Sequence, residues 1–201
     1  MATTALSDIG VLVTVIAGAL AVEATRARYG LRLGGVVAVP LAAVLALTNA
    51  VTLPIYLVGT ALVFGVTTAV HRQTLIYGRV LLAVTLIAAM GYGLAVSLVG
   101  VPATSLQMFF TSLFAGVGAY SLHMTAPADR PATVALSGGL FVVTLVACRL
   151  VVAPPAAGLL TDVGPLAILP AAGVLTLAGV TLARLERRER PLAVHRSGVR
   201  E

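Results

Sequence analysis

The chain alternates long apolar runs with short polar connections, and this pattern predicts helices that cross a membrane. Spanning the hydrocarbon takes about 20 residues of helix, and charges, glycine and proline mark the breaks. Seven runs meet or approach that length, the second being short: residues 9–22, 34–50, 53–70, 80–99, 104–124, 132–152 and 164–182. The predicted fold is an all-α polytopic membrane bundle of about seven transmembrane helices.

Composition supports a single membrane domain. Of the 201 residues, 59% are hydrophobic and only 10% are charged, with a mean hydropathy of +1.06. A soluble chain of this length has no core large enough to hide so much apolar surface. We therefore expect a membrane domain over residues 1–184 and a basic cytoplasmic tail over residues 185–201. The lone Cys148 excludes a disulfide within the chain and is interpreted as a buried packing residue.

The charges predict an orientation. The thirteen basic residues are all arginines, against seven acids, for a net charge of +6. Twelve of the arginines follow the first, third, fifth and seventh runs, whereas the connections after the second and fourth runs carry no charge. The connection after the sixth run offers only Asp162, with Arg149 in the last turns of the helix before it. The positive-inside rule then places the N-terminus outside and the C-terminus in the cytoplasm of a multi-pass membrane protein. The charge excess reports orientation on the lipid bilayer, so nucleic acid is not needed as a partner.

The chain also resembles itself at a shift of 77 residues. This shift matches proline, phenylalanine, threonine and arginine between the third and sixth runs: Pro54 with Pro131, Phe64 with Phe141, Thr67 with Thr144 and Arg72 with Arg149. Units of three spans insert with opposite orientation. The pattern predicts two inverted three-helix repeats plus one extra helix. Chance matching between two apolar segments is the alternative.

Helix-breaking residues lie in the matched second and fifth helices of the two units. The second run begins with "GGVVAVP", which contains Gly34, Gly35 and Pro40, and the fifth run contains Gly116 and Gly118 in "FAGVGAY". Proline inside a span kinks a helix, and broken helices at matching repeat positions mark substrate sites in transporters. A tight seam between two central helices explains the same residues equally well.

The stretch "HRQTLIYGRV", from His71, carries two arginines in a very apolar neighbourhood. Arg72 and Arg79 bracket a predicted cytoplasmic connection, where a charge costs little. Glu23 closes the first run at the same depth. These three charges could pair with one another, hold a partner protein or lie among lipid headgroups.

No catalytic set, metal site or cofactor site can be assembled from the remaining residues. The three histidines have no second ligand at helical spacing, the acids are scattered singly, and no glycine loop ends in Lys-Ser or Lys-Thr. We therefore expect a protein that is not an enzyme and that needs no cofactor.

The order of these features resembles the membrane subunit of poly-γ-glutamate synthesis, the PgsC or CapC family. Members carry a Val-Pro-Gly-Tyr-Leu-Ala element in the second helix and an Arg-x-Thr-x-Leu-Tyr-Gly-Arg-Arg element after the third. Eight positions match: Glu23, Gly35, Pro40, Arg72, Thr74, Tyr77, Gly78 and Arg79. Leu41, Ala42 and Val80 depart from the family pattern. The resemblance covers most of residues 9–152.

The resemblance implies a non-catalytic subunit that docks an ATP-dependent amide ligase of the Mur-ligase type and assists export of the polymer in capsule and cell-envelope biosynthesis. It also implies a further subunit that handles polymer outside the cell. Arg72, Thr74, Tyr77, Gly78, Arg79 and Glu23 are then the candidates for binding the partner or the polymer. The rival hypothesis is a small stand-alone transporter built on the inverted repeat, with its site between Pro40 and Gly116.

Overall fold

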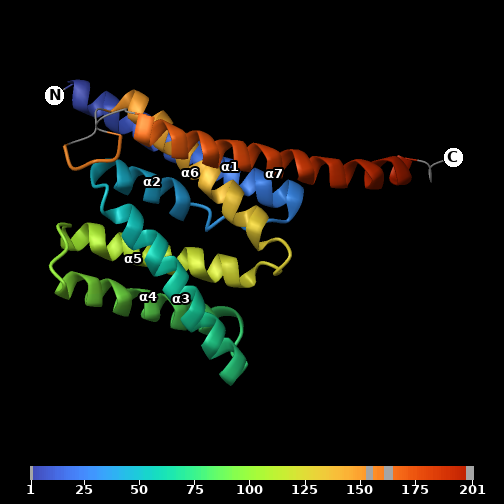
Figure 1. Ribbon diagram of the computed structural model, residues 1–201, viewed down its shortest axis with the longest axis horizontal. Coiled ribbons are helices and arrows are strands. Elements are labelled where there is room, and N and C mark those ends of the chain that lie inside the picture. Colours follow the sequence, from blue (N-terminus) through green and yellow to red (C-terminus); the bar gives the residue numbers. More distant parts are fainter. Residues whose placement is uncertain (1, 153–155, 161–164, 198–201) are drawn as a thin grey trace.

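The computed structural model describes residues 2–152, 156–160 and 165–197 and, within α1 and α7, the side chains of residues 9–29 and 168–187. These residues form helices and connections without strands, which confirms the all-α prediction (Figure 1). The helices are α1 (Ala2–Tyr29), α2 (Ala38–Thr48), α3 (Thr52–Thr74), α4 (Gly78–Leu98), α5 (Ser105–Met124), α6 (Arg130–Val151) and α7 (Pro165–Ser197).

Five of the described helices, α1, α3, α4, α6 and α7, are long and apolar enough to cross a membrane. α5 has 20 residues and is not among these five. α2 has only 11 residues, about 16 Å of helix against a hydrocarbon thickness of about 30 Å. The second run, which is short in the sequence, thus forms a helix too short to cross the hydrocarbon by itself. The positive φ angles of Gly34 and Gly35 keep the chain non-helical before Ala38.

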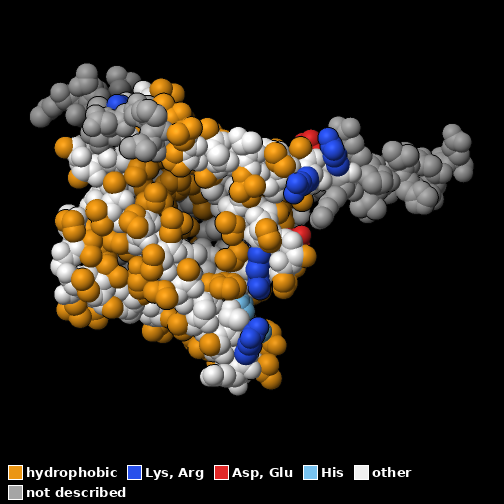
Figure 2. Space-filling view, viewed as in Figure 1, with side chains coloured by type: hydrophobic (Ala, Val, Ile, Leu, Met, Phe, Trp, Pro, Cys, Tyr) orange, Lys and Arg blue, Asp and Glu red, His pale blue; other side chains and the backbone are white. Residues whose placement is uncertain are grey.

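Successive helices run in alternating directions, so α1, α3, α5 and α7 end on one side of the molecule (Figure 1). Most of the basic side chains on the visible face lie along that side, while apolar side chains cover much of the rest (Figure 2). The alternation of basic and neutral connections in the sequence thus corresponds to two ends of one bundle.

The packing pairs follow the predicted repeat. α3 packs on α4 and α5, and α6 packs on α1 and α2, so the third helix of each unit rests on the first two helices of the other. α2 contacts α5 between the two groups, and α7 covers α6. Exchanging the two units therefore exchanges these pairs, as expected of an inverted repeat.

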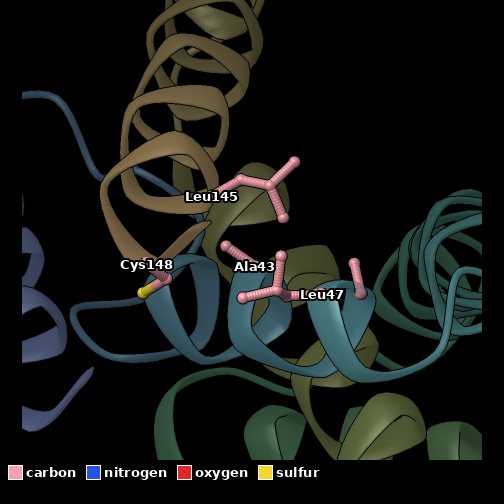
Figure 3. Packing of buried hydrophobic residues seen from close by; sticks show 5 residues of the cluster. Ala43, Leu47, Leu145 and Cys148 are labelled. Carbon is pink, nitrogen blue, oxygen red and sulfur yellow. The ribbon is translucent and has the colours of Figure 1, made fainter. Parts of the chain in front are cut away.

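Small side chains form the seam between α2 and α6. Ala43 and Ala46 of α2 are fully buried and pack with Leu47, Leu145 and Cys148 (Figure 3). Small residues let helix backbones approach closely, and van der Waals contact then stabilises helix pairs in lipid. Cys148 is fully buried in this cluster, which confirms its interpretation as a packing residue.

α7 continues as helix to Ser197, through most of the predicted tail. The described part of the tail holds Glu186 and the exposed Arg187. The remaining predicted tail arginines, together with Asp162 of the sixth connection, lie outside the described side chains. The boundary between membrane domain and tail at residue 184 stays a prediction.

Candidate functional site

The arginine-flanked stretch forms a tight turn between α3 and α4. α3 ends at Thr74, and Leu75 takes a left-handed conformation (φ 53°) in which its N–H donates to the His71 carbonyl at 3.0 Å. Gly78, with φ 65°, starts α4. A left-handed leucine is unfavourable by about 1–2 kcal/mol, so surrounding contacts must hold this backbone in place.

Aromatic and polar contacts supply that support. The His71 ring nitrogen Nδ1 lies 3.0 Å from the carbonyl of Ile76, and the ring meets Tyr77 edge-on with centroids 4.6 Å apart. From α5, the Tyr120 hydroxyl donates to the Gly78 carbonyl at 3.4 Å. The turn is therefore anchored to the bundle from its inner side.

The outer side of the turn is open. Arg72, Thr74, Tyr77, Gly78 and Arg79 are all exposed, and neither arginine forms an ion pair within the described part of the chain. Leu75, which sequence reasoning did not select, is 66% exposed beside Tyr77, which is 65% exposed. Two exposed guanidinium groups thus flank two exposed large side chains at this end of the bundle.

The structure does not bring Glu23 to this turn. The Glu23 carboxylate lies 3.5 Å from the guanidinium of Arg26, one turn along the same helix, and both side chains are about half exposed. The suggestion that Glu23 pairs with Arg72 or Arg79 is therefore wrong. An exposed pair of this kind contributes at most about 1 kcal/mol to stability.

Two histidines meet behind the turn, which the sequence did not predict. The rings of His71 and His123 lie 4.9 Å apart, and His123 Nδ1 is 3.2 Å from the Thr68 hydroxyl. The only signal in the sequence was their position near the same ends of α3 and α5. The pair packs ring against ring and hydrogen-bonds to Thr68, and no group of three potential metal ligands exists among the described residues.

The helix-breaking residues of the first unit delay the start of α2, and the non-helical segment before it, residues 30–37, forms a break between α1 and α2. Gly34 has φ 36° and Gly35 has φ 94°, and a Cβ at Gly35 would lie 2.4 Å from Val117 of α5. Pro40 lies in the first turn of α2, where the missing N–H has no helical partner to lose. Of the two uses considered for Pro40, a kink and close packing, the structure has the second, because Pro40 packs against Gly18.

The glycines of the second unit serve packing. A Cβ at Gly116 would lie 2.8 Å from that of Ala89 in α4, and one at Gly118 would lie 3.1 Å from the hydroxyl of Tyr56 in α3. Both glycines lie within the unbroken helix α5. The glycine-rich stretches of the two matched helices thus have different roles. The stretch before α2 interrupts a helix, whereas the stretch in α5 lets α3, α4 and α5 pack closely.

A cavity of about 160 Å³ opens beside the break, at the basic end of the bundle. α1 contributes Val22 and Arg26, α5 contributes Ser121, and the non-helical segment contributes Arg32, Leu33, Gly35 and Val36. From the sequence, Arg26 and Arg32 were interpreted only as signals of membrane orientation. They line one cavity because the chain turns back after Tyr29, which hydropathy does not reveal.

The family model for capsule biosynthesis CapC matches residues 10–130, more than half of the chain. The chain belongs to the CapC family. The match runs from α1 to the first residue of α6, and so includes both the turn and the break of this CapC-family protein. No curated protein and no solved structure gives a match.

Family membership and the apolar helices together establish a multi-pass membrane protein of capsule biosynthesis. This agrees with the resemblance found in the "RQTLIYGR" and glycine–proline elements.

Proposed function

We propose that this CapC-family protein is a non-catalytic subunit of a membrane complex that makes and exports poly-γ-glutamate or a related peptide polymer. In this role it docks an ATP-dependent amide ligase at the cytoplasmic face and guides the anionic product toward a further subunit outside the cell. The observation that carries the proposal is the turn between α3 and α4, with two unpaired arginines and an exposed Leu75 and Tyr77.

The chemistry of the turn fits a partner with an acidic surface. Guanidinium groups form two-pronged hydrogen bonds with carboxylates, and an exposed aromatic side chain adds apolar contact area. The turn is anchored by His71 and Tyr120, so docking costs little ordering of its backbone. A rigid, positively charged tip is a suitable platform for an acidic protein.

The proposed orientation places this turn in the cytoplasm, where ATP and the ligase are found. α1, α3 and α5 end beside basic connections, and positive charge favours the cytoplasmic side. The same arrangement concentrates arginines where an anionic polymer is made. Electrostatic attraction then raises the local concentration of the product at the subunit.

Co-purification tests this role. We expect the tagged chain, extracted from native membranes in mild detergent, to retain an ATP-dependent amide ligase identified by mass spectrometry. A matched sample carrying Arg187→Gln, an exposed charge on α7 away from the turn, is expected to retain the same ligase. Recovery of the chain without any ligase, under conditions that preserve other membrane complexes, contradicts the docking role.

A stand-alone transporter is the second candidate, and the broken α2 favours it. Half-helices at matched positions line substrate sites in many transporters. Purified chain in liposomes separates the two hypotheses. Movement of a γ-glutamyl oligomer across the bilayer without ligase supports the transporter, whereas movement that requires ligase supports the subunit.

A further inference from the structure

The segment before α2 presents backbone donors that have no partner. No backbone N–H of residues 31–37 donates a hydrogen bond within the described part of the chain. The side chains of Leu31 and Leu33 are 4% and 3% exposed and pack on the bundle, whereas Arg32, Val36 and Val37 of the same segment are exposed. Irregular backbone is tolerated in membrane proteins where it lines a polar cavity.

Two hydroxyl groups of α6 are also unpaired. Thr133 is 2% exposed, and neither its Oγ1 nor the buried Oγ of Ser137 has a hydrogen-bond partner. The two residues are one helical turn apart and therefore share a face of α6. Ser137 Oγ lies 3.8 Å from the position that a Cβ on Gly34 would occupy, as does the Tyr56 hydroxyl. The unpaired hydroxyl of Ser137 thus faces the break itself.

At the break, a cavity brings the backbone donors close to positive charge. Arg26, Arg32 and Ser121 line it, and its 160 Å³ hold about five waters. Arg26 is in an ion pair with Glu23, and Arg32 is in none within the described part of the chain. The cavity lining includes two cations and no acidic side chain. The N-terminus of α2, beyond the break, adds the positive end of a helix dipole.

We propose that this cavity is a carboxylate-binding site that receives a glutamyl carboxylate of the γ-linked chain as the chain leaves the ligase. The site consists of Arg26, Arg32 and Ser121 at the mouth and the backbone at Gly35 within the cavity lining. We place Ser137, which lies beside Gly34, and Thr133, one turn away on α6, behind this lining as the floor of the site. The identity of the ligand rests on the proposed function, whereas the preference for an anion follows from the donors.

A linear polyanion suits the geometry better than a lipid headgroup. The cavity lining includes Val22, seven residues or about 10 Å of helix before the end of α1 at Tyr29. A phospholipid phosphate stays near the membrane surface because its acyl chains fix its depth. A chain with a carboxylate on every unit can enter end-on, with the next carboxylate remaining at the basic surface.

Binding to the purified chain in nanodiscs of zwitterionic lipid tests the site. The probe is a fluorescent γ-linked glutamate pentamer, compared with the α-linked pentamer and with inorganic phosphate. We expect saturable binding of the γ-linked probe that weakens about tenfold or more in the Arg26→Gln/Arg32→Gln double variant. Ser137→Ala and Thr133→Val each remove one donor and are expected to weaken binding about threefold.

Two matched controls separate the site from general charge and packing. Arg28→Gln removes an exposed charge from the same end of α1 without touching the cavity lining. Thr111→Val removes an equally buried and unpaired hydroxyl two turns of α5 away from Gly118. Both are expected to bind within about twofold of the unmodified protein. If Arg28→Gln lowers the affinity as much as the double variant of the cavity arginines does, general surface charge binds the probe and the proposed site is wrong.

The remaining outcomes are equally decisive. Equal affinity for the γ-linked pentamer and phosphate, or full displacement by anionic lipid added to the nanodiscs, overturns the polymer assignment. If neither Ser137→Ala nor Thr133→Val changes the affinity for the probe, the two hydroxyl groups are not part of the site. A protein that retains ligase but does not bind the probe refutes this inference alone, whereas a protein that binds the probe but never retains ligase refutes the docking role alone.

Discussion

The turn between α3 and α4 and the break before α2 use the same residue types in opposite ways. Both combine arginine with glycine at positive φ at the basic end of the bundle. At the turn, a Cβ on Gly78 would meet no atom within 4 Å, and the arginines point outward without partners. At the break, a Cβ on Gly35 would collide with Val117, and the arginines line a cavity.

The difference shows how one membrane subunit can separate two tasks. An outward charge on a rigid tip is available to a protein surface, whereas a charge at the mouth of a cavity, beside unpaired backbone donors, can also hold a group small enough to enter. We infer that the turn selects the ligase and the break receives its product.

The comparison requires both regions to face the cytoplasm, and labelling gives an all-or-none answer. Cysteine placed at Thr3 or at Ser197, in a Cys148→Ser background, is expected to react with an impermeant thiol reagent in intact cells only at position 3. The reason is that every strongly basic connection falls on the other side. Labelling at position 197 in sealed cells contradicts the orientation.

Charge removal at the turn should abolish docking without unfolding the protein. Arg72→Gln and Arg79→Gln lie at an exposed turn, where stability changes by less than about 0.5 kcal/mol. Loss of a desolvated charge pair with a partner costs about 2–5 kcal/mol. We expect normal accumulation with loss of ligase co-purification.

The lysine variants make that result specific. Arg72→Lys and Arg79→Lys keep the charge and lose the two-pronged geometry, so they should retain part of the complex. If the glutamine variants assemble normally, these arginines mark topology only. If they fail to accumulate, their role is structural.

Glycine substitution should separate the two regions by stability. Gly35→Ala combines a strained φ with a collision against Val117, for an expected loss of about 2–4 kcal/mol. Gly78→Ala carries only the backbone strain and should cost about 1 kcal/mol. Thermal unfolding monitored by gel filtration in detergent measures both, and equal losses contradict the distinction between a packed break and an open turn.

Much of the fold could be predicted from hydropathy because a span leaves a long, uninterrupted apolar signal. The break escaped this reasoning, since "GGVVAVP" is as apolar as a helix and only the positive φ of Gly34 and Gly35 stops it. The turn residues were found because two arginines stand out between spans. Arg26 and Arg32 gave no such signal, because their shared cavity depends on how α1, α5 and the non-helical segment meet.

The two three-helix units also differ in a way that sequence matching does not show. The repeat shift sets Gly34 and Gly35 on Thr111 and Ser112, which lie inside a continuous α5 that starts with a capping box between Thr104 and Gln107. Sequence matching revealed the shared packing of the two units. It could not reveal that only the first unit has an interrupted second helix, because the interruption depends on two glycines with no counterpart in α5.

The smallest expected effect concerns the hydroxyl groups of the proposed floor. A buried hydroxyl that is paired contributes about 0.5–1.5 kcal/mol, whereas one without a partner contributes nothing favourable to the empty protein. Thr67 is paired, with its Oγ1 2.7 Å from the Val63 carbonyl and 3.0 Å from the Thr85 hydroxyl, whereas Thr133 is equally buried and unpaired. Thr67→Val should therefore lower stability by about 1 kcal/mol.

Thr133→Val should leave stability unchanged or slightly raised, because it replaces an unsatisfied polar atom by a methyl group of similar size. A polar group kept at such a position without stabilising the fold is expected to serve a ligand. Thermal unfolding of the two valine variants in the same detergent decides the point. A loss at Thr133 as large as that at Thr67 means that its hydroxyl already has a structural partner, and the floor of the proposed site then consists of Ser137 and the backbone alone.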